Sequence, residues 1–145
     1  MEIALTRQSV HGMPASEYAA ELRERLPDHE ITLAETTAAE RDAIRRAEVV
    51  TGDGRRTVEL LSDATQLRLL ACVYAGTSHL DHEAFREAGV ALTNAAGVHA
   101  PNVSEYVIGA LLSLARDFRR ATRQQDRHEW SSYQCRELHG STVCI

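Results

Sequence analysis

The chain has 145 residues, of which 43% are apolar and 26% are charged, a balance typical of a globular protein large enough to bury a core. This composition excludes collagen-like and largely disordered chains. All 16 basic residues are arginine, and they are outnumbered by 21 acidic residues. The resulting net charge of −5 argues against general binding to nucleic acid or to anionic membranes.

The first two thirds of the chain alternate short apolar segments with segments of helical periodicity. We predict strands at 3–6, 31–33, 48–51, 67–74 and 90–93, and helices at 14–26, 37–47, 58–61 and 80–87. Thr37, with Glu40 three residues later, has the pattern of a capping box. Strands and helices that alternate with short connections predict an α/β fold, a doubly wound parallel sheet covered on both faces.

The last third of the chain has a different pattern. Apolar residues recur with a period of 3.6 from Val103 to Phe118, which predicts one long amphipathic helix over about 101–127. Asn102 and Glu105 would cap the start of this helix. The final residues, Thr142–Ile145, have the character of a strand.

Ligands of open parallel sheets bind beyond the carboxyl ends of the strands. Glycine follows three of the predicted strands, in segments 51–54, 74–77 and 94–97, where it either lets a small anion approach the backbone or only turns the chain. Of the seven histidines, His11 and His99 fall in the predicted crevice loops. No histidine spacing fits a metal site, and the sequence holds no G-x-S-x-G, P-loop or complete G-x-G-x-x-G motif.

The three cysteines have no paired spacing, and the N-terminus lacks both a basic region and a long apolar stretch. No apolar run approaches the length of a membrane span. We therefore expect a cytoplasmic protein with reduced thiols and no membrane partner.

Three ordered motifs carry a family resemblance. Segment 74–81, YAGTSHLD, resembles G-A-G-x-D-x-x-D; segment 90–105 resembles V-x-N-x-x-G-x-x-A-x-x-V-A-E; and segment 137–145, ELHGSTVCI, resembles E-L-x-G-K-T-V-G-I. Together they resemble the D-isomer-specific 2-hydroxyacid dehydrogenases from residue 67 to the end. Tyr74, Ser78 and Tyr106 depart from the usual residues of these motifs.

The resemblance implies a flavodoxin-like substrate domain at 1–100, an interdomain helix at 101–128, and a loop with the first strand of a dinucleotide domain at 129–145. It further implies hydride transfer between NAD or NADP and a small 2-hydroxy or 2-oxo acid. A homodimer through the terminal helix or the second domain is expected. The family's phosphate-binding glycines and its catalytic Arg, Glu and His would all follow residue 145, so we expect this chain alone to be inactive and to bind no cofactor tightly.

By the same resemblance, residues 74–77 form a carboxylate loop, whose backbone amides would bind the substrate carboxylate. The positions implied for substrate binding are Tyr74, Ala75, Gly76, Thr77, Asn94 and Gly97. Cofactor contacts are implied at Ala75 and Val107, and no catalytic or metal-binding residue is expected within the chain. The alternative is a non-catalytic interaction or regulatory module on the same fold, in which the apolar helix face recruits a partner.

Overall fold

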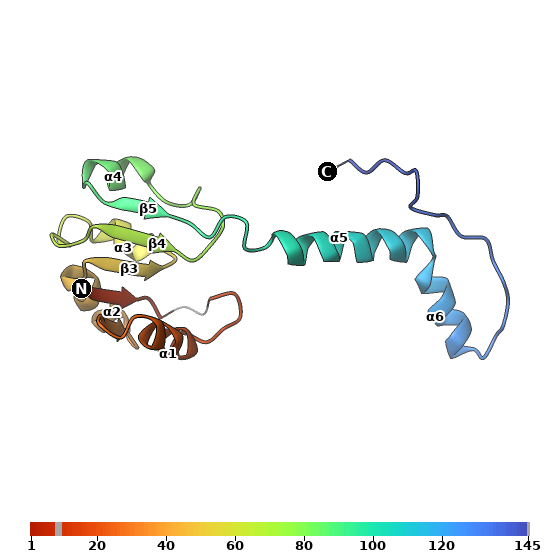
Figure 1. Cartoon of the computed structure of the whole chain (residues 1–145), viewed down its shortest axis with the longest axis horizontal. Coiled ribbons are helices and arrows are strands. Elements are labelled where there is room, and N and C mark those ends of the chain that lie inside the picture. The colour runs from red at the N-terminus through yellow and green to blue at the C-terminus, as the bar shows by residue number, and fades with distance from the viewer. Residues whose placement is uncertain (8–9, 145) are drawn as a thin grey trace. The chain divides into compact units, whose positions relative to one another are not determined.

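The computed structural model describes residues 1–7 and 10–144. The chain forms two compact units, Met1–Val98 and His99–Ile145. The first unit is a five-stranded sheet with strand order β2-β1-β3-β4-β5, in which every neighbouring pair is parallel (Figure 1). The predicted doubly wound parallel α/β fold is therefore confirmed.

The elements of the first unit follow the predicted alternation. The strands are β1 (Glu2–Leu5), β2 (Glu30–Leu33), β3 (Val49–Gly52), β4 (Leu69–Cys72) and β5 (Ala91–Thr93). The helices are α1 (Ala15–Arg25), α2 (Thr37–Arg46), α3 (Arg55–Glu59) and α4 (His82–Glu87). Most bounds lie within two residues of those predicted, whereas α3 begins at Arg55, three residues before its predicted start. β4 ends at Cys72, so Tyr74 belongs to the following loop.

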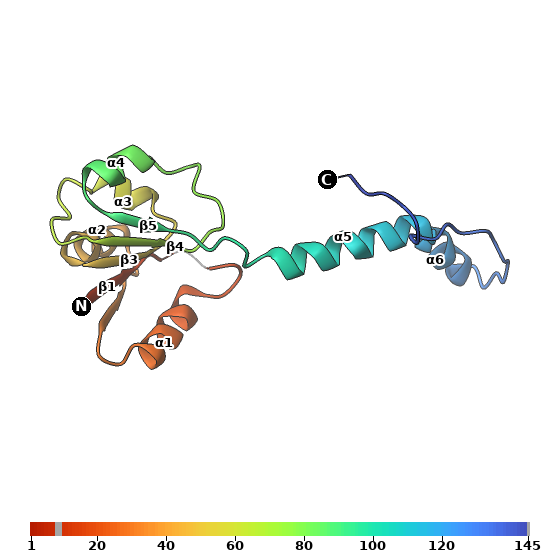
Figure 2. The same cartoon turned by 45° about the horizontal axis from the view of Figure 1, so that its top comes forward.

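One face of the sheet carries the main core. Val50 and Leu70 point to this face and pack with Ile44 of α2 and Phe85 of α4, all of them fully or almost fully buried. Helix α1 lies on the opposite face from α2, α3 and α4 (Figure 2). This core anchors the carboxyl end of β4, where the carboxylate loop begins.

The prediction that helices cover both faces holds only in part. On the face that carries α1, Tyr18 reaches as far as β3, where its Oη and the Thr51 Oγ1 lie 3.2 Å apart. Beyond it, Ala91 and Thr93 of β5 are exposed. Within the described residues this face has one helix for five strands, and its β5 edge is therefore uncovered.

The capping box predicted at Thr37 is wrong by one residue. Thr36 is the N-cap of α2, and its Oγ1 accepts a hydrogen bond of 3.1 Å from the Ala39 amide. Glu40 turns inward instead, is 3% exposed, and forms an ion pair of 2.8 Å with the Arg56 Nε of α3. A carboxylate in the first turn can serve either role, and here the partly exposed Arg56 draws the buried Glu40 into an ion pair.

The second unit holds two helices rather than one long helix. α5 (Ala100–Ala115) and α6 (Phe118–Asp126) are separated at Asp117, which has a positive φ of 49° and caps α6 by accepting from the Arg120 amide. The Arg136 amide donates to the Ala115 carbonyl at 2.9 Å, and the Tyr133 hydroxyl donates to the Arg116 carbonyl at 3.3 Å. These hydrogen bonds from side chains and the following loop replace those of the next helical turn. The apolar residues keep their helical spacing through this point, but the helix itself is interrupted.

Two terminal predictions of this unit are also wrong. α5 begins at Ala100 with Pro101 in its first turn, so Asn102 and Glu105 lie inside the helix and do not cap it. Residues 142–144 form no strand, and Ile145 lies outside the described residues. A strand needs a neighbour to accept its hydrogen bonds, and within 99–144 no strand is present. No helix in the described part of the chain has the length and apolar character needed to span a membrane.

Candidate functional site

The carboxylate loop follows β4 and is tied to the segment after β5. The Tyr74 carbonyl accepts from the Ala95 amide at 3.1 Å. The Ala75 carbonyl accepts from the Asn94 side-chain Nδ2 at 2.8 Å. Asn94 therefore acts as a brace that joins two neighbouring loops at the carboxyl edge of the sheet.

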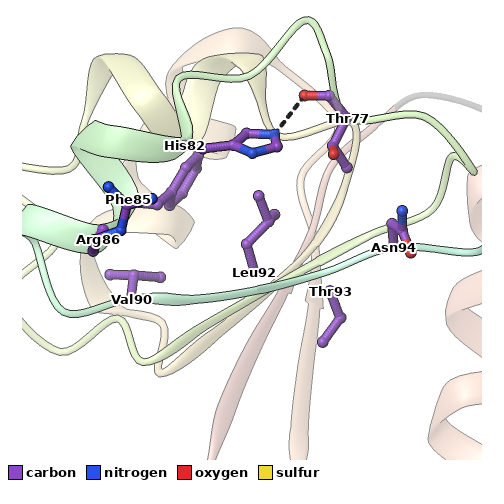
Figure 3. Close-up of a pocket in the computed structure, with 8 residues that line it drawn as sticks. All are labelled: Thr77, His82, Phe85, Arg86, Val90, Leu92, Thr93 and Asn94. Atoms are coloured by element: carbon purple, nitrogen blue, oxygen red, sulfur yellow. Dashed lines mark hydrogen bonds between the residues drawn. The ribbon is translucent and has the colours of Figure 1, made fainter.

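Both ends of the loop are held in the same way, through carbonyl groups. The Val73 carbonyl, just before the loop, lies 2.7 Å from the His11 Nε2. The Thr77 carbonyl accepts from the Leu80 amide at 3.0 Å and lies 2.9 Å from the His82 Nε2 (Figure 3). A carbonyl can only accept, so both imidazoles carry a hydrogen on Nε2.

The amides of the loop are used differently. Those of Ala75, Gly76 and Thr77 donate to no acceptor within residues 1–7 and 10–144. Most carbonyls of the loop are therefore engaged in hydrogen bonds, whereas three consecutive amides are not. The loop backbone thus offers hydrogen-bond donors and few acceptors. Such a backbone suits an anion, because an anion accepts hydrogen bonds from N–H groups and donates none.

Gly76 itself has an ordinary backbone. Its φ is not among the positive values of this chain, and a Cβ added there would meet nothing within 4 Å. Neither left-handed geometry nor crowding thus requires glycine at this position. Gly97, in contrast, has a φ of 88°, so it turns the chain after β5.

A cavity of about 670 Å³ lies between α4 and the outer edge of β5 (Figure 3). Thr77 and Asn94 lie on its rim, while Phe85 and Leu92 give it an apolar wall. His82 stands over this cavity with its ring turned to the Thr77 carbonyl. Two of the predicted substrate positions therefore share one depression.

The structure also shows polar contacts that sequence reasoning missed. Asp53, 5% exposed, follows β3 and pairs with the Arg55 Nε at 3.0 Å, and its carbonyl lies 3.1 Å from the His79 Nε2. In the sequence, the one feature that could have indicated these contacts was the position of Asp53 just beyond a predicted strand. The described residues contain no group of three or more histidine, cysteine or acidic side chains that could hold a metal ion.

The two implied cofactor positions belong to different units. Ala75 lies in the carboxylate loop, whereas Val107 lies on α5 with a half-buried side chain. The 145 residues hold no G-x-G-x-x-G segment, so these two positions alone do not make a dinucleotide site. Their cofactor role stays a prediction.

Comparison with known proteins is decisive for the family. The model for the catalytic domain of D-isomer-specific 2-hydroxyacid dehydrogenases matches residues 5–143. The chain belongs to this family. The family that the three sequence motifs predicted is thereby confirmed.

Relatives within the 2-hydroxyacid dehydrogenase family include an erythronate-4-phosphate dehydrogenase of Salinibacter ruber, 36% identical over 63% of this chain and 22% of its own length. A D-3-phosphoglycerate dehydrogenase of Methanocaldococcus jannaschii is 27% identical over 91% of this chain and 26% of its own length. The chain thus spans about a quarter of the length of these relatives.

A solved structure of a family protein from Aeromonas salmonicida subsp. salmonicida matches 95% of the chain and 44% of its own, with 29% identity and a TM-score of 0.74. The D-lactate dehydrogenase of Aquifex aeolicus, complexed with NAD and lactic acid, has a TM-score of 0.69 at 19% identity. It covers 94% of this chain and 41% of its own, and at that identity it supports the fold alone.

Proposed function

We propose that the first unit is the substrate-binding domain of an NAD-dependent D-2-hydroxyacid dehydrogenase, and that its carboxylate loop binds the carboxylate of a small 2-hydroxy or 2-oxo acid. The observation that carries this proposal is the one-sided bonding of the loop. The carbonyls of Val73, Tyr74, Ala75 and Thr77 are engaged, while the amides of Ala75, Gly76 and Thr77 have no acceptor among the described residues.

A carboxylate complements this arrangement because it only accepts hydrogen bonds. Its two oxygens can take up several N–H donors, and bonds to a charged acceptor are about twice as strong as neutral ones. The loop follows the buried strand β4, so the amides are held by a rigid element rather than ordered at each binding event. The exposed Gly76 leaves the approach to these amides open, since a Cβ-free residue shields them least.

The chemical step is proposed on the strength of family membership. In the family's reaction, NAD or NADP would accept the hydride of a 2-hydroxy acid, and its reduced form would donate a hydride to a 2-oxo acid. The residues of this chain bind and orient the acid, and hydride transfer requires further residues that bind the nucleotide and exchange the proton. We therefore expect the 145-residue chain alone to show no turnover with 2-oxo acids and NADH.

The second unit supports a homodimer as its proposed assembly. α5 carries exposed apolar side chains on several sides, among them Ile108, Leu112 and Leu114, and within the described residues none of its side chains is buried. Exposed apolar area of this kind is typical of a surface that meets a partner. The competing non-catalytic module would use the same surface to bind a partner. Sedimentation velocity of the chain tests whether this surface forms a homodimer. Failure of the carboxylate test below would favour the non-catalytic module.

The proposed carboxylate site can be tested with the isolated chain. Nuclear magnetic resonance titration with D-lactate should shift the amides of residues 75–77, whereas D-lactamide, which lacks the negative charge, should leave them unchanged. Gly76→Val should abolish these shifts, since its side chain covers the amides. Gly109→Val is the matched control and should leave the shifts unchanged. A Cβ at Gly109 also meets nothing within 4 Å, and its φ is not positive. Gly109 lies on α5, in the other unit.

Two outcomes would contradict the proposal. D-Lactate shifts spread over the whole chain, or equal shifts with D-lactamide, would show that the loop does not recognise the carboxylate. Undiminished binding by a folded Gly76→Val protein would remove these amides from the site.

A further inference from the structure

His11 occupies an unusual turn after β1. Val10 and Met13 exchange two backbone hydrogen bonds, of 2.9 and 2.8 Å, around the pair His11-Gly12. Both central residues have a positive φ, 50° for His11 and 88° for Gly12, as in the type I′ turn of a tight hairpin. The left-handed region is unfavourable for a residue with a Cβ, so the turn holds His11 at a cost that its side-chain contacts must offset.

Those contacts reach the carboxylate loop, more than 60 residues further along the chain. The His11 Nε2 lies 2.7 Å from the Val73 carbonyl, the last peptide oxygen before the loop. The His11 ring also meets Tyr74 edge-on, with 5.6 Å between the ring centroids and 83° between the planes. One imidazole thereby holds both the backbone and the first side chain of the loop.

A second imidazole braces Tyr74 as well. The His79 ring lies 6.5 Å from the Tyr74 ring at an interplanar angle of 79°, and its Nε2 lies 3.1 Å from the Asp53 carbonyl. The two histidines thus connect segments that follow β1, β3 and β4, which are neighbours in the sheet. Tyr74 departs from the glycine usual at this position of the family motif, so the aromatic contact is a feature of this chain's own sequence.

We propose that His11 is a positioning residue for the carboxylate loop. By holding the Val73 carbonyl it fixes the peptide plane at the start of the loop, and the amides of Ala75, Gly76 and Thr77 are then preset to receive an anion. This inference rests on the proposed function, because the anion is the carboxylate of the 2-hydroxy or 2-oxo acid. A preset loop raises affinity because less conformational freedom is lost on binding.

The test compares three forms of the 145-residue chain: wild type, His11→Ala and His11→Gln. Ala and Gln meet the same backbone cost at a positive φ, but only Gln offers a side-chain N–H of similar reach. In His11→Ala, hydrogen exchange at the Ala95 amide, which donates to the Tyr74 carbonyl of the loop at 3.1 Å, should accelerate while exchange at Val50 in the core is unchanged. The D-lactate Kd should rise roughly 3- to 10-fold, as expected for one lost hydrogen bond. His11→Gln should restore much of both. His139→Ala, in the second unit, is the control that should change neither.

A ligand-free signature accompanies these measurements. Long-range proton–nitrogen correlation of the wild-type chain should show the His11 ring protonated on Nε2, as its 2.7 Å contact with a carbonyl requires. A His11 ring without a hydrogen on Nε2 would overturn the positioning role. Exchange at Ala95 and D-lactate affinity that are both unchanged in His11→Ala would also overturn it. Wild-type protein that gives no D-lactate shifts at 75–77 while His11→Ala still loosens the loop would overturn the carboxylate function, and would reduce His11 to a structural brace.

Discussion

Gly52 offers the sharpest test of the packing at the site edge of the sheet. It ends β3 with a φ of 151°, a region that is almost restricted to glycine. A Cβ at this position would overlap the Thr6 Oγ1 and lie 2.8 Å from both the Cβ and the Cγ2 of Thr6. Thr6 is 4% exposed, so it has little room to move aside.

The cost of Gly52→Ala follows from these two effects. A non-glycine residue in such a backbone region costs about 1–3 kcal/mol, and an overpacked buried site costs about 1–3 kcal/mol more. Taking about 3 kcal/mol as the sum and about 4–8 °C per kcal/mol for a unit of this size, Tm should fall by roughly 12–24 °C. Far-ultraviolet circular dichroism during heating gives this value directly.

Gly76→Ala is the matched control for the same measurement. Its added Cβ meets nothing within 4 Å and its φ is not positive, so its Tm should stay close to that of the wild type. Adding Thr6→Ala to Gly52→Ala should restore part of the loss, because the Oγ1 and Cγ2 are removed while the Cβ contact at 2.8 Å remains. Equal Tm values for Gly52→Ala and Gly76→Ala would refute the reasoning.

Three further changes test the core and the polar contacts around it. Phe85→Ala, at a side chain 1% exposed, should lower the free energy of unfolding by about 3–5 kcal/mol in urea titration, and a loss below about 1 kcal/mol would contradict its place in the core. Glu40→Gln should cost about 1 kcal/mol, the upper end for exposed ion pairs, because Glu40 is buried while the Arg56 side chain is 33% exposed. A double-mutant cycle with Arg56→Gln should then be non-additive, and additivity would deny the ion pair. Asp81→Ala should cost about 1 kcal/mol through lost capping of the Glu83 and Ala84 amides, whereas Asp81→Asn should preserve most of it; equal losses would deny the cap.

The sequence by itself determined the order and type of the elements in the first unit. Apolar residues that recur every two or every 3.6 residues show which side of a strand or helix is buried. In the first unit, the buried sides are those that pack in or against the sheet. The parallel arrangement followed as well, since each strand is separated from the next by a helical segment. Motif spacing also predicted the carboxylate loop directly after the strand that is β4, with Asn94 in the adjacent loop.

Only the tertiary structure decided which polar groups meet. The apolar period of α5 continues from Leu114 to Phe118, yet the helix breaks between them because Asp117, Tyr133 and Arg136 offer competing bonds to the backbone. Glu40 was expected to cap α2, but the N-cap lies one residue earlier, at Thr36, and Glu40 pairs with the distant Arg56 instead. Local patterns do not encode such choices, since the partners come from segments brought together by the fold.

The same division holds at the candidate site. Sequence identified residues 74–77 by type, but their bonding depends on His11, 62 positions from Val73, and on Asn94, 19 positions from Ala75. The direction of a peptide plane is set by what its carbonyl finds nearby, and no periodicity carries that information. Sequence thus pointed to the backbone segment for which carboxylate binding is proposed. The packing of three loops at the carboxyl edge of the sheet decided that the amides of 75–77 have no acceptor among the described residues.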